Sequence, residues 1–252
     1  MREQIDTIPV NEAFESQDEC PFCWLERQAE QSAIRYTAGP CASYMEPDVR
    51  GVTDKVGFCR EHMKKLYDYG NNLGNALMLQ TYYAGLLEGL QNRLDSYEMP
   101  EKRKFFSKKA QPEDSELTSW VKNRLSSCFI CDRVEYNMKR YFHTFFVMLK
   151  NEEFCRRLES SKGFCLPHFL QLLELAPEEL ANNRHEWFYD TVCNLTLRNL
   201  ARVKGDVDWF VEKFDYRNSG ADWKNSRDAV TRGMQKLRGG HPSDGPYRSE
   251  PR

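Results

Sequence analysis

The sequence predicts an all-α protein of two duplicated helical units, each with a Cys₃His metal knuckle and a long amphipathic helix. A repeated cysteine and histidine motif, helical periodicity in the long segments, and the lack of a convincing alternating strand run support this class. The chain has 252 residues, of which 40% are hydrophobic and 13% aromatic. It can therefore bury a substantial core, as one domain or as two fused ones.

A Cys-x-x-Cys pair followed by Gly-Phe-Cys-x-x-His occurs twice. The first copy consists of CPFC and GFCREH, and the second of CFIC and GFCLPH. The candidate metal ligands are Cys20, Cys23, Cys59, His62, Cys128, Cys131, Cys165 and His168. The spans from Cys20 to His62 and from Cys128 to His168 are nearly equal. A repeat this long indicates duplication of a whole small domain rather than a solenoid.

The spacing of these residues is typical of zinc binding. Two ligands separated by two residues converge on one ion, and two such pairs complete a tetrahedron around Zn²⁺. Because the spans are nearly equal, we expect one Cys₃His site within each half of the chain. The alternative is an exchanged arrangement, in which Cys20 and Cys23 share an ion with Cys165 and His168. Three cysteines lie outside the motif and are interpreted as small buried hydrophobes: Cys41, Cys155 and Cys193.

Two other chemistries use cysteines at this spacing. CPFC is similar to the CPxC of thiol redox proteins, but CFIC lacks the proline and no βαβ context surrounds either pair. Iron–sulfur clusters also take cysteine ligands and tolerate histidine. An iron–sulfur or thiol redox protein is therefore the alternative to a zinc protein.

Helices are expected around both motifs. The segment after CFIC places Val134, Met138, Tyr141, Phe145 and Met148 on one helical stripe, and the segment after CPFC also reads as a helix. Gly57 and Gly163 allow the chain to turn in the left-handed region before the next helix delivers its Cys and His. Long amphipathic helices are predicted over 71–97 and 184–214.

The predicted organisation follows the repeat. Residues 1–99 form the first metal-binding unit, 100–115 a charged linker and 116–225 the second unit. Residues 226–252 hold a short helix, with Ser226 as N-cap and Gly239 as stop, and a disordered tail. We expect this C-terminal segment to dock on the body of the protein.

Charge and motifs exclude several function classes. A formal net charge of −2 gives no reason to expect nucleic acid binding. No run approaches the ~18 apolar residues of a membrane span, and the acidic N-terminus does not read as a signal peptide, so we expect a cytoplasmic location. No catalytic motif is present. A non-enzymatic binding or adaptor protein with an unknown protein partner is the leading hypothesis.

The paired motifs CPFC with GFCREH and CFIC with GFCLPH, together with the closing FDYRN and DWKNSRDAV, resemble an uncharacterised bacterial family of unknown function. The resemblance covers nearly the whole chain and implies no activity. Some members of that family carry the label of an ABC transporter substrate-binding protein. The present sequence argues against that label, because it lacks the signal peptide and the α/β lobe pattern.

Overall fold

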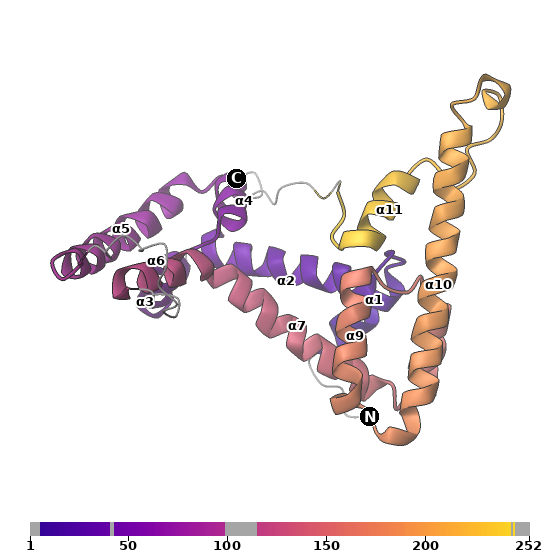
Figure 1. The fold of residues 1–252 in the computed structure, drawn as a ribbon, viewed down its shortest axis with the longest axis horizontal. Helices are drawn as coiled ribbons and strands as arrows, with labels where there is room; N and C mark the ends of the chain where they lie inside the picture. The colour runs from indigo at the N-terminus through magenta and orange to yellow at the C-terminus, as the bar shows by residue number, and fades with distance from the viewer. Residues whose placement is uncertain (1–5, 41–42, 99–114, 243, 245–252) are drawn as a thin grey trace, which may run out of the picture. The chain divides into compact units, whose positions relative to one another are not determined.

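The fold is described from a computed structural model for residues 6–40, 43–98, 115–242 and 244. These residues form eleven α-helices and two 3₁₀ helices, without a β-strand among them (Figure 1). The predicted all-α class is confirmed. Cys41, the expected linker up to residue 114 and the tail from residue 245 lie outside the described residues.

The helices of the two halves follow one order. The first half contains α1 (Thr7–Glu15), α2 (Pro21–Ala38), the 3₁₀ helix η1 (Ser43–Met45), α3 (Pro47–Val56), α4 (Arg60–Tyr69) and α5 (Asn72–Leu94). The second contains α6 (Glu116–Ser126), α7 (Phe129–Met148), α8 (Glu152–Ser160), α9 (Leu166–Glu179) and α10 (Asn182–Glu212). The 3₁₀ helix η2 (Tyr216–Asn218) and α11 (Ala229–Arg238) follow. Five helices per half are consistent with a duplication.

The motifs lie at helix N-termini, as expected. Cys20 and Cys128 directly precede α2 and α7, and Cys59 and Cys165 are the N-cap residues of α4 and α9. Gly57 and Gly163 adopt φ of +66° and +72°, which glycine reaches without steric cost. A Cβ on Gly57 would also lie 2.7 Å from the Tyr82 ring. The turn therefore depends on glycine for conformation and for space.

Compact packing divides the described residues differently from the sequence repeat. Unit 1 contains residues 6–29 and 134–242 with 244, and unit 2 contains residues 30–40, 43–98 and 115–133. Each unit takes helices from both halves of the chain. Helices α2 and α7 contribute one part to each unit. The units thus differ from the sequence halves 1–99 and 116–225.

Unit 1 is built around an aromatic core. The rings of Phe22 and Phe142 stack with centroids 4.2 Å apart, and Phe145 contacts Phe14, Phe164 and Phe188. The ligand cysteines of this unit belong to the same buried cluster. Apolar burial and ring contacts therefore hold the segments that carry the motif residues.

The last helix packs on unit 1. Helix α11 contacts α9 and α10 within this unit (Figure 1). It ends at Gly239 as expected, with φ of +75°, whereas its N-cap is Asp228 rather than Ser226. Within the expected C-terminal segment, α11 docks on the helices of unit 1 as predicted.

Unit 2 has a smaller buried core. Helix α5 packs against α3, α4 and α6, and few of its side chains are buried. A cavity of about 290 Å³ opens beside these helices, and it is lined mainly by apolar side chains that include Phe58, Met63, Leu66 and Leu79.

Among the described residues, no helix is long and apolar enough to cross a membrane.

Candidate metal centres

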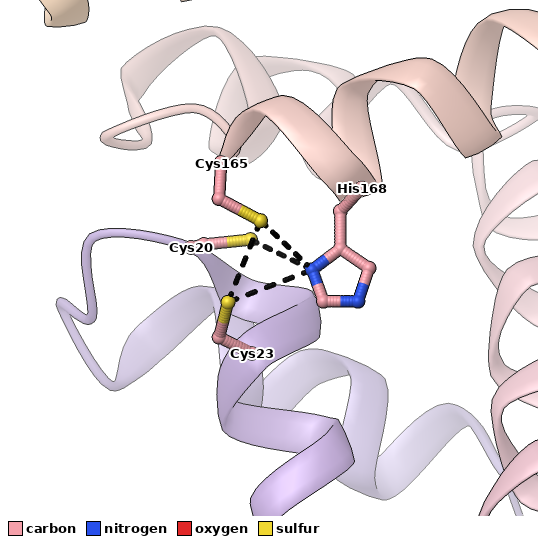
Figure 2. A group of neighbouring side chains, drawn as sticks. All are labelled: Cys20, Cys23, Cys165 and His168. Carbon is pink, nitrogen blue, oxygen red and sulfur yellow. Dashed lines mark hydrogen bonds between the residues drawn. The ribbon is translucent and has the colours of Figure 1, made fainter. Parts of the chain in front are cut away.

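The eight predicted ligands form two groups of four. Site 1 consists of Cys20, Cys23, Cys165 and His168, which Figure 2 shows converging from the start of α2 and the start of α9. The His168 Nδ1 atom lies 3.4, 3.5 and 3.1 Å from the sulfurs of Cys20, Cys23 and Cys165. The sulfurs of Cys23 and Cys165 are 3.5 Å apart. All four residues are buried in unit 1.

Site 2 consists of Cys59, His62, Cys128 and Cys131, all within unit 2. The His62 Nδ1 atom lies 3.2 Å from the Cys59 sulfur and 3.3 Å from each of the other two. The sulfurs of Cys59 and Cys131 are 3.9 Å apart. His62 and Cys128 are buried, whereas Cys59 is half-buried and Cys131 is exposed.

These separations match the edges of one tetrahedron. Zinc lies about 2.3 Å from sulfur and about 2.0 Å from nitrogen, so tetrahedral angles place two sulfurs about 3.8 Å apart and a sulfur and a nitrogen about 3.5 Å apart. In each site the four ligand atoms lie within 4.8 Å of one another. Each group therefore has the size to coordinate a single ion.

The pairing expected from the near-equal spans is wrong. Each group takes its CxxC pair from one half of the chain and its CxxH pair from the other, which is the exchanged arrangement. The reason is helix length. An 18-residue helix such as α2 is about 27 Å long, and Cys59 packs in the unit that holds the C-terminal part of α2 rather than its start. The CxxC that reaches Cys59 is the one that opens α7.

Both histidines face a carboxylate on α2 with their second nitrogen. The His62 Nε2 atom lies 3.0 Å from Glu30 Oε1, which also pairs with Lys65, and His168 Nε2 lies 3.9 Å from Glu26 Oε2. Carboxylates at this position orient the ring of metal-binding histidines. The sequence interpretation missed both residues. Glu26 and Glu30 follow Cys23 by three and seven positions, a spacing that places them on its helical face.

The pKa shifts in site 2 show that the three thiols lack enough positive charge nearby to ionise together. Burial alone would lower the pKa of His62, but hydrogen bonds with Cys128 and Glu30 outweigh it and raise the pKa to about 10. Burial would raise the pKa of Cys128, but its bond to His62 lowers that pKa to about 6. Burial and the neighbouring Cys128 raise the pKa of Cys131. Without a metal, one thiolate pairs with an imidazolium while Cys131 retains its proton.

Site 1 behaves in the same way. Burial opposes protonation of His168, yet its hydrogen bonds with Cys165 and Cys20 raise its pKa to about 11. The bond to Cys165 raises the pKa of Cys23. Several thiolates cannot coexist in a buried group without positive charge, and a divalent cation supplies that charge. The donor set fits a metal that prefers sulfur and imidazole.

Among the described residues, the other cysteines and histidines lie outside the two groups. Cys155 and Cys193 are half-buried rather than buried, and the Cys155 thiol donates to the Leu149 carbonyl at 3.1 Å. His143 pairs with Glu179 and His185 with the Leu180 carbonyl. Cys155, His143 and His185 thus make local hydrogen bonds.

A comparison with protein-family models identifies the family of this chain. Residues 1–244 match the model of a family of unknown function, DUF6062. The chain belongs to this family. The resemblance inferred from the motifs is thus confirmed. No curated protein and no solved structure shows a significant match.

Proposed function

We propose that the protein binds two zinc ions, one in each Cys₃His group, and acts as a non-enzymatic binding or adaptor protein. The observation that carries the zinc proposal is the convergence of all eight motif residues into two groups with tetrahedral edge lengths. A cytoplasmic location belongs to this proposal, because thiolate ligands persist in a reducing compartment.

The geometry favours a single ion over an iron–sulfur cluster. In a cluster of several irons, the four protein ligands are divided among the iron atoms, and ligands on different irons are separated further by the iron–iron spacing. In each site all four candidate ligand atoms lie within 4.8 Å of one another, which suits four ligands that share one ion. A mononuclear iron ion would have similar edges, and metal analysis distinguishes it from zinc.

The surface of α5 supports a binding role. Leu79, Tyr83, Leu87 and Leu94 are exposed and lie along one side of this helix. Glu88 and Arg93 are its charged residues, whereas the corresponding helix α10 carries charges from Arg184 to Glu212. A helix with apolar residues on its solvent side is typical of an interface. We propose that this side of α5 binds an apolar helix of a protein partner.

Elemental analysis of variants tests the zinc sites and their pairing together. Wild type should hold two zinc ions per chain and show no visible absorption. The double variant Cys20→Ser with Cys165→Ser should lose one ion, because both residues belong to site 1. Cys20→Ser with Cys59→Ser should lose both. The reverse pattern would mean that each half binds its own ion, and iron in wild type would support the redox alternative.

Matched leucine variants test the adaptor role. Leu87→Arg places a charge on the apolar side of α5, and Leu197→Arg places one at an exposed leucine on α10. A partner recovered with wild type and Leu197→Arg, but not with Leu87→Arg, would identify the α5 surface as its binding site. Equal recovery with all three proteins would contradict this assignment. Light scattering of the purified protein shows whether the partner is a second copy.

A further inference from the structure

The two candidate zinc sites have the same donors but differ in access to solvent. In site 1 the relative exposure is 0% for Cys20 and Cys165 and 2% for Cys23. In site 2, Cys131 is exposed and Cys59 is half-buried. A small polar reagent can reach sulfur in site 2 and is shielded from sulfur in site 1.

Site 1 is closed by the end of α11. A Cβ on Gly239 would lie 3.7 Å from the sulfurs of both Cys23 and Cys165. Glycine at this position lets the backbone approach both sulfurs, and its φ of +75° ends the helix there. The backbone at Gly239 thus lies against two of the candidate ligand sulfurs and shields them.

Buried polar contacts hold α11 over site 1. The Lys236 ammonium donates to the Glu19 carbonyl and to the Lys162 carbonyl at 2.6 Å, beside the two motif segments. Gln235 donates to Asp18 at 2.6 Å. Since Asp18 and Glu19 directly precede Cys20, these contacts fix the cover to the ligand loop.

Site 2 presents its two accessible sulfurs side by side. The sulfurs of Cys59 and Cys131 are 3.9 Å apart, whereas Cys128 is 2% exposed. A disulfide needs a sulfur–sulfur distance of about 2.0 Å, so a shift of about 2 Å would join them. The accessible pair is therefore also a pair that can be oxidised together.

We propose that site 2 is an oxidant-responsive zinc site, in which peroxide joins Cys59 to Cys131 and releases the ion, while site 1 keeps its zinc. This inference rests on the proposed zinc sites. The thiolate of Cys131 attacks the peroxide oxygen, forming a sulfur–oxygen bond and releasing hydroxide. The Cys59 thiolate then attacks that sulfur, forms the disulfide and releases a second hydroxide.

The reaction balances without a further reactant. Two thiolates lose two electrons in total and hydrogen peroxide gains them, and the two hydroxides formed take up two protons from the buffer to become water. Zinc leaves as Zn²⁺, because His62 and Cys128 alone are two ligands of the four it needs. His62 lies on α4 next to Met63, which lines the cavity of unit 2. Leu79, one residue of the α5 surface proposed to bind a partner, lines the same cavity, so release of the ion beside Met63 would disturb one end of that surface.

The test uses the full-length, zinc-loaded protein. Metal content is measured first, and hydrogen peroxide is then added in the presence of a chromogenic zinc chelator. We expect loss of one of the two zinc ions and, by peptide mapping without reduction, a disulfide between Cys59 and Cys131. Thiol reductant and added zinc should restore two ions per chain.

Two variants make the result specific. Cys193→Ala removes a half-buried cysteine outside both sites and should release one ion as wild type does. Lys236→Met loosens the cover over site 1 and should allow release of the second ion. Release of both ions from wild type at one rate, or of neither, would overturn the inference. A protein without two zinc ions before peroxide would instead overturn the proposed function.

Discussion

Sites 1 and 2 hold the same four donors in different surroundings. The ligands of site 1 belong to a buried aromatic cluster and are covered by α11. Those of site 2 lie in a unit with a small buried core and a cavity of about 290 Å³ beside the motif. If both groups bind zinc as proposed, the ion in site 1 would reinforce an existing core, and the ion in site 2 would stabilise a unit that has little core of its own. The donors determine which metals can bind, and the surrounding packing determines how much stability the unit loses when the metal leaves.

The largest expected effect distinguishes these two roles. Cys59→Ser and Cys165→Ser remove corresponding ligands from sites 2 and 1. We expect Cys59→Ser to unfold α4 and α5, because structural zinc contributes on the order of 10 kcal/mol and unit 2 has little core to compensate. Cys165→Ser should lose its ion but keep the helices of unit 1 that pack on the aromatic core.

Hydrogen exchange measured by mass spectrometry on both variants checks this difference. Amides of α5 should lose protection in Cys59→Ser, while amides of α7 and α10 stay protected in Cys165→Ser. If α10 lost protection in Cys165→Ser as fully as α5 does in Cys59→Ser, the idea that the core of unit 1 stands without metal would be wrong.

Loosening the contact of α11 with site 1 is expected to have an intermediate effect on stability. Lys236→Met leaves the carbonyls of Glu19 and Lys162 without their buried donor, which costs roughly 1–3 kcal/mol for each unsatisfied group. Urea unfolding monitored in unit 1 measures this loss. The control is Lys204→Met, which removes an exposed pair with Asp208 and should change stability by about 0.5 kcal/mol or less. Equal effects of the two variants would show that α11 is not held by Lys236.

The smallest expected effects concern the carboxylates behind the histidines. Glu30→Gln weakens a 3.0 Å contact with His62 and should lower the zinc affinity of site 2 by about 10- to 100-fold. Glu26→Gln alters a 3.9 Å contact with His168 and should change site 1 less. Competition with a chelator of known affinity measures both. If Glu26→Gln lowered zinc affinity more than Glu30→Gln, Glu26 rather than Glu30 would be the carboxylate that orients its histidine more strongly.

Much of the candidate site could be predicted from the sequence because its signals are local. The repeated CxxC and GFCxxH motifs picked out the eight residues that the structure brings into two groups, and the left-handed turns need glycine at positions 57 and 163 whatever the surroundings. The long helices followed from the periodicity of apolar residues, since each helix needs one face to pack. Helix α3 and the half-buried state of Cys155 were not predicted, because their surroundings come from distant segments.

By itself, the sequence determined the helical class, the duplicated motif and the donor set, all of which depend on residues close together in the chain. Tertiary structure decided which donors converge in one group, because Cys59 is packed in the unit that holds the C-terminal part of α2 and not its start, where Cys20 and Cys23 lie. It also decided that α11 covers site 1 while Cys131 stays exposed in site 2. Equal spacing along a chain does not fix distance in space, since helix length and packing determine which segments meet.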